Sequence, residues 1–421
     1  MKRYNSYKST GIQWLPEIPS YWEVLRFGSL FKRKPAINKP EEELLSVFLD
    51  RGVIKASDSE KRTHQASEDL SKYQLVEPSD FVMNNQQAWR GSVGVSDYTG
   101  IISPAYHIFP MPSCYDYHYA DYLLRDRVMV NLFDISSKGV GSIQRTLNFN
   151  WLNNGKCLLP PIEEQRQIVA YLDKKTTLIE TCKCQREREL QALNELKQAE
   201  IASVVTRGLN PNVPMKDSGI FWQPLIPENW TVTKLKHVLS KLDRPRQPED
   251  ELLVCSNSGE VKKRGDSRLG LVADSDEIYQ GVRRGDLLIH GMDTWHGAIA
   301  VSDYDGMCTP VVHVCDSTQN KKYIALYLRN MANQKVFKLI SNGVRQNTSD
   351  FRSWGKVGTI PIPIPPIEEQ DAIVAYIDSK NGMIDKMIAA LTAEIERLTE
   401  YKQRLISDVV TGQMNVQDET A

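Results

Sequence analysis

At residues 159–180 the chain reads LPPIEEQRQIVAYLDKKTTLIE, and at residues 364–385 it reads IPPIEEQDAIVAYIDSKNGMID. The two stretches lie 205 positions apart, from Pro160 to Pro365. Each begins with two prolines, which are tolerated at the start of a helix. Two glutamates follow, and negative charge is favourable at the positive end of a helix dipole. The repeated stretch therefore predicts the start of a helix in each half of the chain.

Both helices are predicted to be long. No proline interrupts either stretch, and Gly208 and Gly412 stand where a C-terminal cap is expected. Roughly 45 residues at 1.5 Å each would make either helix about 67 Å long.

The duplication extends well beyond the helices. Four residues of the first half recur in the second at a common offset: Gly11, Trp14, Pro19 and Trp22 return as Gly219, Trp222, Pro227 and Trp230. Further along, WRG (89–91) and VSDY (95–98) return as WHG (295–297) and VSDY (301–304). Two copies are too few for a solenoid. They give one chain the approximate two-fold layout of a dimer instead.

The helices carry a coiled-coil pattern. Apolar residues recur at heptad spacing in both: Leu172, Ile179 and Leu193 in the first helix, and Ile377, Ile384, Leu391, Leu398 and Leu405 in the second. The first pattern is weaker, because Arg186 interrupts it. Lys197 and Lys402 occupy equivalent seam positions, where a lysine either fixes the register or extends its charge into water. From the repeat symmetry we predict that the two helices pair antiparallel and hold the globular regions apart at opposite ends.

The fold class expected is mixed α/β or α+β, with two globular regions and two long antiparallel coiled-coil helices. Short β-like runs such as LLSVFLDRGVI (44–54) and GDLLIHGM (285–292) occur between turn-forming residues. The predicted boundaries are a first globular region, a first helix, a second globular region, a second helix and a C-terminal tail, at 1–158, 159–208, 209–363, 364–412 and 413–421.

Composition limits the class of protein. A chain of 421 residues exceeds a single core, and no apolar run approaches the roughly 20 residues of a membrane span. We therefore expect a cytoplasmic protein, with its seven cysteines as reduced thiols. A net charge of −1 argues against a stand-alone basic DNA-binding protein, and suggests that a partner supplies part of any grip on phosphate.

The sequence contains no recognisable catalytic motif. It lacks a phosphate-binding G-x-x-x-x-G-K-[ST] loop, a dinucleotide-binding G-x-G-x-x-G after a strand, and the zinc motif H-E-x-x-H. Asp250 with Glu260 and Lys262 could be forced into a nuclease pattern, but a charged surface strand is the simpler interpretation. His107 and His313 are equivalent, and each sits in an apolar run, so we predict buried, hydrogen-bonded scaffold histidines. We expect no metal site.

Two globular regions alternating with two near-identical helices that begin at PPIEEQ resemble the specificity subunit of Type I restriction–modification enzymes. The matching residues include WLPEIPSYW (14–22), WQPLIPENW (222–230), LSVFLDRGVI (45–54) and both PPIEEQ stretches. The resemblance covers almost the whole chain. It implies that each globular region is a target recognition domain reading one half of a split DNA site.

The resemblance also implies partners and cofactors. The helices would set the spacer between the half-sites and dock two modification subunits, which carry the methyltransferase and its S-adenosylmethionine. Restriction subunits, which translocate and cut DNA with ATP and Mg²⁺, would join the complex. This chain would hold no cofactor and perform no catalysis.

Comparing the two halves suggests which residues read bases. Identical residues should build a common scaffold: Trp89 and Trp295, Gly91 and Gly297, Asp97-Tyr98 and Asp303-Tyr304, Pro104 and Pro310. Polar residues that differ beside them are candidates for base contact, because Gln pairs with adenine and Arg with guanine. The candidates in the first half are Gln86, Gln87, Arg90, Lys138, Gln144 and Arg145, and those in the second are His296, Arg345, Gln346 and Asn347.

Two basic runs in the second half could hold phosphates. They comprise Lys262, Lys263 and Arg264, and Arg283 with Arg284. Two alternatives remain open at this point. One is a coiled-coil scaffold that binds proteins and no DNA, and the other is a self-sufficient nuclease or methyltransferase, which the missing motifs disfavour.

Overall fold

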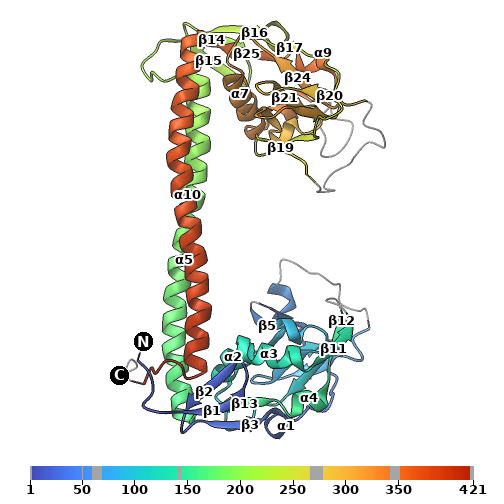
Figure 1. Ribbon diagram of the computed structural model, residues 1–421, viewed down its shortest axis with the longest axis vertical. Helices are drawn as coiled ribbons and strands as arrows, with labels where there is room; N and C mark the ends of the chain where they lie inside the picture. Colours follow the sequence, from blue (N-terminus) through green and yellow to red (C-terminus); the bar gives the residue numbers. More distant parts are fainter. Residues whose placement is uncertain are drawn as a thin grey trace. The chain divides into compact units, whose positions relative to one another are not determined.

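The computed structural model describes residues 2–49, 51–58, 69–140, 144–265, 278–341 and 351–417. The chain divides into two compact units, each of which contains one globular head and parts of both long helices (Figure 1). Unit 1 comprises Met1–Glu187 with Ala393–Ala421, and unit 2 comprises Arg188–Thr392. We call the globular part of unit 1 head 1 and that of unit 2 head 2. Arg345, Gln346 and Asn347 lie outside the described residues.

Head 1 is built from small antiparallel sheets covered by short helices. Its strands are β1 (Tyr7–Ile12), β2 (Leu15–Pro19), β3 (Glu23–Arg26), β4 (Leu45–Phe48), β5 (Gly52–Lys55), β6 (Gln74–Val76), β7 (Phe81–Asn84), β8 (Val93–Val95), β9 (Gly100–Ile102), β10 (Tyr106–Phe109), β11 (Ser137–Val140), β12 (Gln144–Leu147) and β13 (Lys156–Leu159). Its helices are α1 (Phe27–Leu30), α2 (Tyr117–Arg125), α3 (Arg127–Ile135) and α4 (Phe149–Asn153), with 3₁₀ turns η1 (Ala56–Asp58) and η2 (Ala88–Arg90). The central sheet has the order β10-β7-β8.

Head 2 repeats this plan. Its strands are β14 (Met215–Ile220), β15 (Gln223–Pro227), β16 (Thr231–Lys234), β17 (Ser240–Lys241), β18 (Leu253–Cys255), β19 (Val261–Lys263), β20 (Gln280–Val282), β21 (Leu287–His290), β22 (Ile299–Val301), β23 (Gly306–Cys308), β24 (Val312–Asp316) and β25 (Pro361–Ile364). Its helices are α6 (Leu235–Val238), α7 (Lys321–Asn333), α8 (Val336–Ile340) and α9 (Trp354–Val357), with the 3₁₀ turn η3 (Thr294–His296). The central sheet has the order β17-β24-β21-β22.

The central strands are apolar on both faces because each face meets a different core. In head 1, Phe81 and Met83 of β7 pack with helices α2 and α3, whereas Val82 packs with β4 and β5. In head 2, Leu287 and Ile289 of β21 pack in the larger core, whereas Leu288 packs in a smaller, separate core. Side chains alternate across a strand, so a strand covered on both sides must read as a continuous apolar run.

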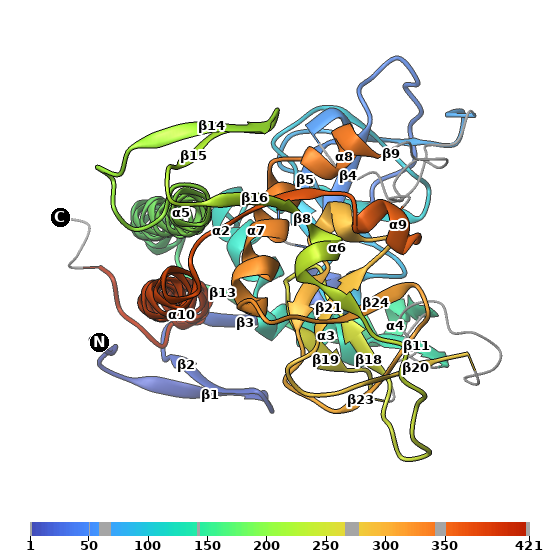
Figure 2. The same ribbon diagram turned by 90° about the horizontal axis from the view of Figure 1, so that it is seen from above.

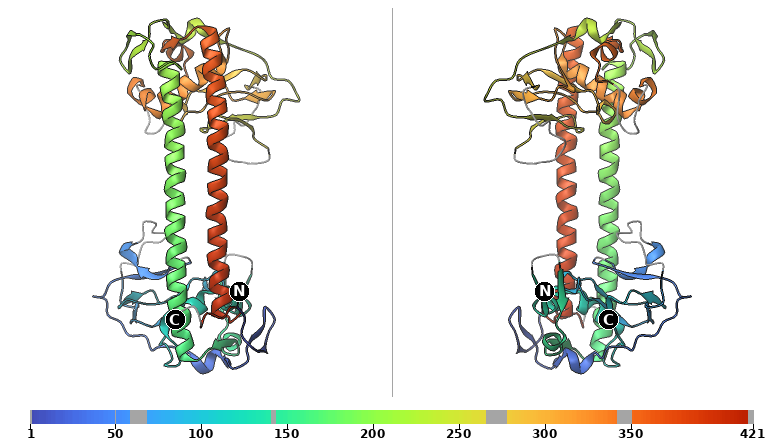
Figure 3. Two further views of the ribbon diagram at one scale, coloured as in Figure 1. Left: turned by 90° about the vertical axis from the view of Figure 1, so that its left-hand side faces the viewer. Right: turned by 90° about the vertical axis from the view of Figure 1, so that its right-hand side faces the viewer.

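The long helices are α5 (Ile162–Arg207) and α10 (Ile367–Val410), and they lie side by side within each unit (Figures 1 and 3). Unit 1 joins the first part of α5 to the last part of α10, where Leu172 and Ile179 share a core with Leu405. Unit 2 joins the last part of α5 to the first part of α10, where Val204 shares a core with Ile377. The pairing is therefore antiparallel in each unit, as predicted.

The remaining predicted seam residues also lie on the covered side of their helices. Ile384 is buried, and Leu193, Leu391 and Leu398 are partly buried. Arg186, which interrupts the first heptad pattern, reaches across the pair to the Glu394 carboxylate at 3.1 Å. A cation at the seam is thus accommodated by an acid on the facing helix.

Lys197 and Lys402 both take partners on the opposite helix. Lys402 lies 2.8 Å from the Glu180 carboxylate in unit 1, and Lys197 lies 2.5 Å from the Asp385 carboxylate in unit 2. Glu180 and Asp385 are themselves 205 positions apart, so the two ion pairs are copies of one another. The side chains are only partly covered. Of the two alternatives, the geometry favours a role in register over simple extension into water.

The repeated PPIEEQ motif anchors each long helix to its head. Gln165 is fully buried, donates from Nε2 to the carbonyl oxygens of Cys114 (3.0 Å) and Pro160 (2.8 Å), and accepts the Asp116 N–H at 2.8 Å. Gln370 makes the equivalent bonds in head 2, accepting the N–H of Asn320 and donating to the carbonyl of Pro365. Each glutamine therefore ties the start of a long helix to the start of α2 or α7.

The C-terminal end of α10 packs against head 1, and the C-terminal end of α5 packs against head 2. The Tyr119 hydroxyl of α2 donates to the Val410 carbonyl at 2.9 Å, and the Tyr323 hydroxyl of α7 donates to the Val205 carbonyl at 3.3 Å. Gly208 and Gly412 follow these ends with φ of 77° and 71°, as the predicted caps require.

Each opening hairpin packs beside the end of a long helix. The β14–β15 hairpin lies beside α5, where Gln223 Nε2 donates to the Thr206 carbonyl at 3.1 Å (Figure 2). The β1–β2 hairpin receives the segment that follows α10, because Gln413 Nε2 donates to the Glu17 carbonyl at 2.9 Å. Residues 413–417, assigned to a tail on sequence grounds, bury Val416 in the core of head 1.

Candidate nucleic-acid interface

The loop that follows β7 in head 1 is held by its own polar groups. The Asn84 Oδ1 accepts the N–H groups of Gln86 (2.9 Å) and Gln87 (3.1 Å), and the Trp89 indole N–H donates to the Gln86 carbonyl at 2.9 Å. These bonds fix the conformation of the loop. The side chains of Gln86 and Arg90 are exposed, and that of Gln87 is half-buried. The loop presents amide and guanidinium donors at fixed positions.

The second candidate segment of head 1 is a β-hairpin. Strands β11 and β12 pair with Gly139 opposite Arg145, and Lys138 is exposed. Arg145 forms an ion pair with Asp134 of α3 at 2.5 Å. Gln144 begins β12, and its side chain lies outside the described part of the chain.

The two candidate segments of head 1 meet on one aromatic ring. The guanidinium carbon of Arg90 lies 5.1 Å from the centre of the Trp89 ring, and that of Arg145 lies 4.6 Å from it. The structure thus brings together residues more than 50 positions apart in the sequence. Sequence reasoning selected both segments but did not predict their contact.

Head 2 carries different cations at the corresponding loop. Lys338 of α8 lies 5.5 Å from the centre of the Trp295 ring. His296 is exposed, with its Nδ1 3.9 Å from the Asp293 carboxylate. His290 is largely covered, and burial lowers its pKa although Asp293 opposes the shift. The Nδ1 of His290 lies 3.1 Å from the Asp293 backbone nitrogen and 3.2 Å from the Asp293 carboxylate.

The basic runs of head 2 are largely balanced by acids. Lys262 pairs with Glu260 at 2.9 Å, Lys263 with Glu251 at 2.5 Å, and Arg283 with Asp250 at 3.0 Å. Glu251, Asp250, Lys263 and Arg283 line a charged hollow of about 520 Å³. The contact with Glu251 raises the pKa of Lys263. The pairs of Lys262 and Lys263 are exposed, and exposed ion pairs are weak and exchangeable. Arg283 is held more firmly, because the side chain of Asp250 is largely covered. All of these residues, with Arg264 and the exposed Arg284, remain predictions as phosphate contacts.

The two equivalent histidines differ. His313 is buried with its Nε2 2.7 Å from the Phe351 carbonyl oxygen, as predicted for a scaffold histidine. His107 is also buried, but neither ring nitrogen has a hydrogen-bond partner among the described residues, so that part of the prediction is wrong. The centres of the His107 and Phe149 rings lie 4.6 Å apart in an edge-to-face arrangement. Burial lowers the pKa of His107 to about 4. An apolar neighbour therefore replaces the expected partner.

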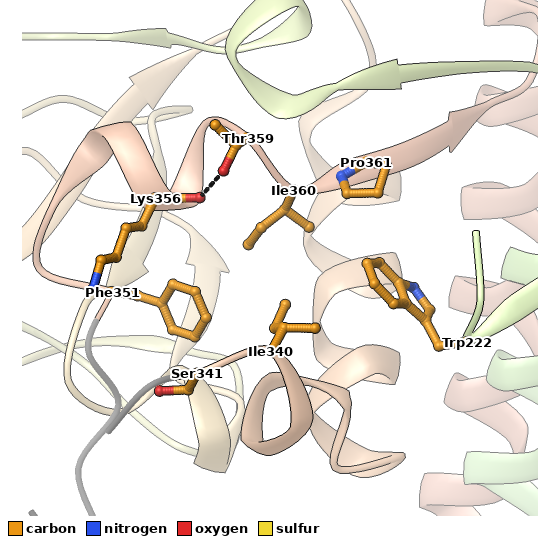
Figure 4. A pocket seen from close by; sticks show the side chains of 8 residues that line it. All are labelled: Trp222, Ile340, Ser341, Phe351, Lys356, Thr359, Ile360 and Pro361. Carbon is orange, nitrogen blue, oxygen red and sulfur yellow. Dashed lines mark hydrogen bonds between the residues drawn. The ribbon is translucent and has the colours of Figure 1, made fainter. Parts of the chain in front are cut away.

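A second hollow in unit 2 has a volume of about 350 Å³ (Figure 4). Its walls present both polar and apolar groups, and they comprise Trp222, Ile340, Ser341, Phe351, Lys356, Thr359, Ile360 and Pro361. The only hydrogen bond drawn between these residues runs from the Thr359 hydroxyl to the Lys356 carbonyl at 2.8 Å. Among the described residues that line this hollow there is no Asp, Glu or His, so they do not supply the paired groups of an acid–base site.

Within the described ranges, no group of three or more His, Cys, Asp or Glu side chains is arranged to hold a metal ion. Over the same ranges, no helix is long and apolar enough to cross a membrane.

No family model matches the chain. Curated relatives match over nearly its whole length. The putative type I restriction enzyme MjaX specificity subunit of Methanocaldococcus jannaschii is 24% identical over 427 residues, covering 95% of each chain. The MjaVIII specificity subunit of the same organism is 22% identical with the same coverage. The EcoDI specificity subunit of Escherichia coli is 22% identical over 78% of each chain.

Solved structures share the fold. A chain from a structure describing complex assembly and conformational transition of the type I restriction–modification system has a TM-score of 0.69 and 14% identity, covering 94% of this chain and 99% of that one. The crystal structure of the HsdS subunit from Thermoanaerobacter tengcongensis has a TM-score of 0.52 and 15% identity, covering 94% and 98%. The resemblance to Type I specificity subunits and the mixed fold with two long helices are confirmed.

Proposed function

We propose that this chain, a relative of Type I specificity subunits, is the DNA sequence-specificity subunit of a Type I restriction–modification complex. Head 1 and head 2 each read one half of a bipartite DNA site. We further propose that the chain is non-catalytic and acts in the cytoplasm. The modification subunits would bring S-adenosylmethionine, and the restriction subunits would bring ATP and Mg²⁺.

One observation carries the proposal: equivalent loops in the two heads share a tryptophan and differ in the polar groups around it. In head 1 the ring of Trp89 carries Arg90 and Arg145, and in head 2 the ring of Trp295 carries Lys338. Two similar surfaces with different donors suit two different half-sites, because sequence is read by donors and acceptors at base edges. A protein-binding scaffold without DNA would not need such a difference.

The paired helices support a role in setting the spacer. An apolar seam and cross-helix ion pairs fix the register of α5 against α10 within each unit. Readers of two half-sites depend on the distance between their reading surfaces, commonly about 34 Å for ordinary dimers. We propose that these helices fix that distance.

The exposed surface of the helices supports docking of two copies of one partner. The exposed large apolar side chains there are Leu178, Leu196, Ile367, Met383, Met387 and Tyr401. Four of them form two pairs. Leu178 and Met383 are equivalent by the repeat, as are Leu196 and Tyr401. Unit 1 contains Leu178 and Tyr401, and unit 2 contains Leu196 and Met383. Equivalent apolar positions in both units suit two modification subunits bound alike.

The decisive experiment is methylation by the reconstituted complex. The chain is purified with its methyltransferase subunits and incubated with a randomised DNA library and S-adenosylmethionine, and methylated adenines are mapped. A two-part motif with a fixed gap is expected. The chain alone, incubated with DNA, Mg²⁺ and S-adenosylmethionine, should modify and cut nothing. Methylation without a two-part motif, or gel-shift binding with no sequence preference, would refute the proposal.

A length variant tests the spacer role. One heptad inserted into both α5 and α10 preserves the seam and lengthens each helix by about 10 Å. The preferred gap should grow by about three base pairs at 3.4 Å each, with both half-sites unchanged. The matched control inserts seven residues after Val416, outside the helix pair, and should leave the gap as it is.

A further inference from the structure

Trp89 has more polar contacts than a scaffold residue requires. It comes from the loop after β7, and its indole N–H is fixed by the Gln86 carbonyl at 2.9 Å. Its ring is close to two guanidinium groups from different segments, Arg90 at 5.1 Å and Arg145 at 4.6 Å. The ring is only partly buried, so both cations lie at the surface of head 1.

The two arginines are held to different degrees. Arg145 is bounded by the Trp89 ring and by the Asp134 carboxylate at 2.5 Å, and about a third of its side chain is exposed. Arg90 is exposed and touches the ring from its own loop. Interactions on two sides reduce the conformational freedom that a long side chain loses on binding. Arg145 is therefore the pre-organised donor, whereas Arg90 suits the less exacting contact with a phosphate.

Head 2 keeps the ring, and the described residues beside it differ from those of head 1. The residue after Trp295 is His296 instead of arginine. The ring is met by Lys338. When LFDI (132–135) is aligned with VFKL (336–339), Lys338 stands where head 1 has Asp134. An ammonium is a point charge, whereas a guanidinium presents a planar fork with two parallel N–H bonds. Among the described residues, the heads thus share a platform and differ in the groups beside it, with His296 in place of Arg90 and Lys338 on the ring.

We propose that Trp89 and Trp295 are positioning residues for base recognition, and that Trp89 directs Arg145 to a guanine in the half-site of head 1. Guanine presents two acceptors, O6 and N7, side by side in the major groove, which match the guanidinium fork. A guanidinium has five N–H groups, so a carboxylate at one nitrogen does not prevent an edge from facing a base. The inference rests on the proposed function and adds the base that head 1 reads.

The test uses the chain in complex with its methyltransferase subunits, methylating a DNA library with one half-site position randomised at a time. In Trp89→Leu, preference for guanine should fall about tenfold or more at one position of one half-site, because a bidentate pair is lost. Trp89→Phe keeps an aromatic face and should retain most of the preference. Arg145→Lys should reproduce the Trp89→Leu effect at the same position. Trp295→Leu is the matched control, and should change the other half-site alone.

Several results would overturn the inference. These are an unchanged profile in Trp89→Leu, a loss spread evenly over both half-sites, or a position sensitive to Arg145 that is not guanine. A Trp89→Phe variant as impaired as Trp89→Leu would show that the ring only packs. If the wild-type complex itself showed no two-part preference, the proposed function would fail instead, so the two failures are distinguishable. Thermal unfolding of each variant shows whether head 1 is still folded.

Discussion

Replacing Gln165 with methionine should destabilise unit 1 by about 3–5 kcal/mol, because methionine fills a similar volume and forms no comparable hydrogen bonds. The wild-type amide is fully buried and serves three backbone groups: the carbonyls of Cys114 and Pro160, and the N–H of Asp116. Each buried group left without a partner costs about 1–3 kcal/mol, and water entering the site would reduce the total. Asp116 is also the N-cap of α2. When its backbone N–H loses the Gln165 acceptor, the start of α2 should loosen.

The equivalent change in unit 2 should be milder. Gln370 serves the Asn320 N–H and the Pro365 carbonyl, but its third partner is the side chain of Gln319, which is partly exposed and can turn to water. We expect Gln370→Met to cost about 2–4 kcal/mol. Arg166→Met is the control, since its exposed pair with Glu163 contributes at most about 1 kcal/mol.

Urea unfolding followed by hydrogen–deuterium exchange measures both effects. Exchange at the start of α2 should accelerate in Gln165→Met while the start of α7 is unchanged, and Gln370→Met should show the reverse. If Gln165→Met were as mild as Arg166→Met, the buried amide would not be the anchor that its hydrogen bonds suggest.

Three further predictions follow from the structure. Gly382 lies inside α10 with open space around it, so Gly382→Ala should stabilise the helix by about 0.5–1 kcal/mol in urea unfolding; Gly412→Ala, at φ 71°, should destabilise it. The pKa of His107 is lowered from 6.5 to about 4, so its contribution to stability is complete above pH 6.5 and is lost as pH falls toward 4. Unfolding measured at pH 7.5 and 4.5 should therefore differ less in His107→Leu. Lys402→Glu places two acids together and should lower stability by up to about 1 kcal/mol, which exchanging the charges of Lys402 and Glu180 should restore in a double-mutant cycle.

The long helices could be predicted because their signals are local. Paired prolines and glutamates mark each start, and Gly208 and Gly412 mark each end. Their antiparallel pairing followed from symmetry and the heptad seam. The sequence alone does not decide what the seam lysines do, because this depends on which residue faces Lys402 across the pair, and register is a tertiary property.

The heads were less predictable, since their contacts join distant segments. The meeting of Arg90 and Arg145 on Trp89 depends on a hairpin that no local pattern specifies. The sequence marks Gln165 as part of a repeated motif, but its burial and its three backbone partners follow only from the packing of α5 against head 1. Among the described residues, His107 has no hydrogen-bond partner, and the ring that packs against it belongs to Phe149 of α4, far along the chain.

The offset between the two copies changes within the heads and is constant within the helices. It is 208 from Trp22 to Trp230 and 206 from Trp89 to Trp295, both inside the heads. Along α5 and α10 the offset is 205. It holds for Pro160 and Pro365, which precede the helices, and for the ion-paired Lys197 and Lys402 in their C-terminal parts. A one-residue change inside a helix would rotate every later seam residue by about 100° and separate such ion pairs. Loops in the heads face no such constraint, so the half-sites can diverge while the proposed spacer stays fixed.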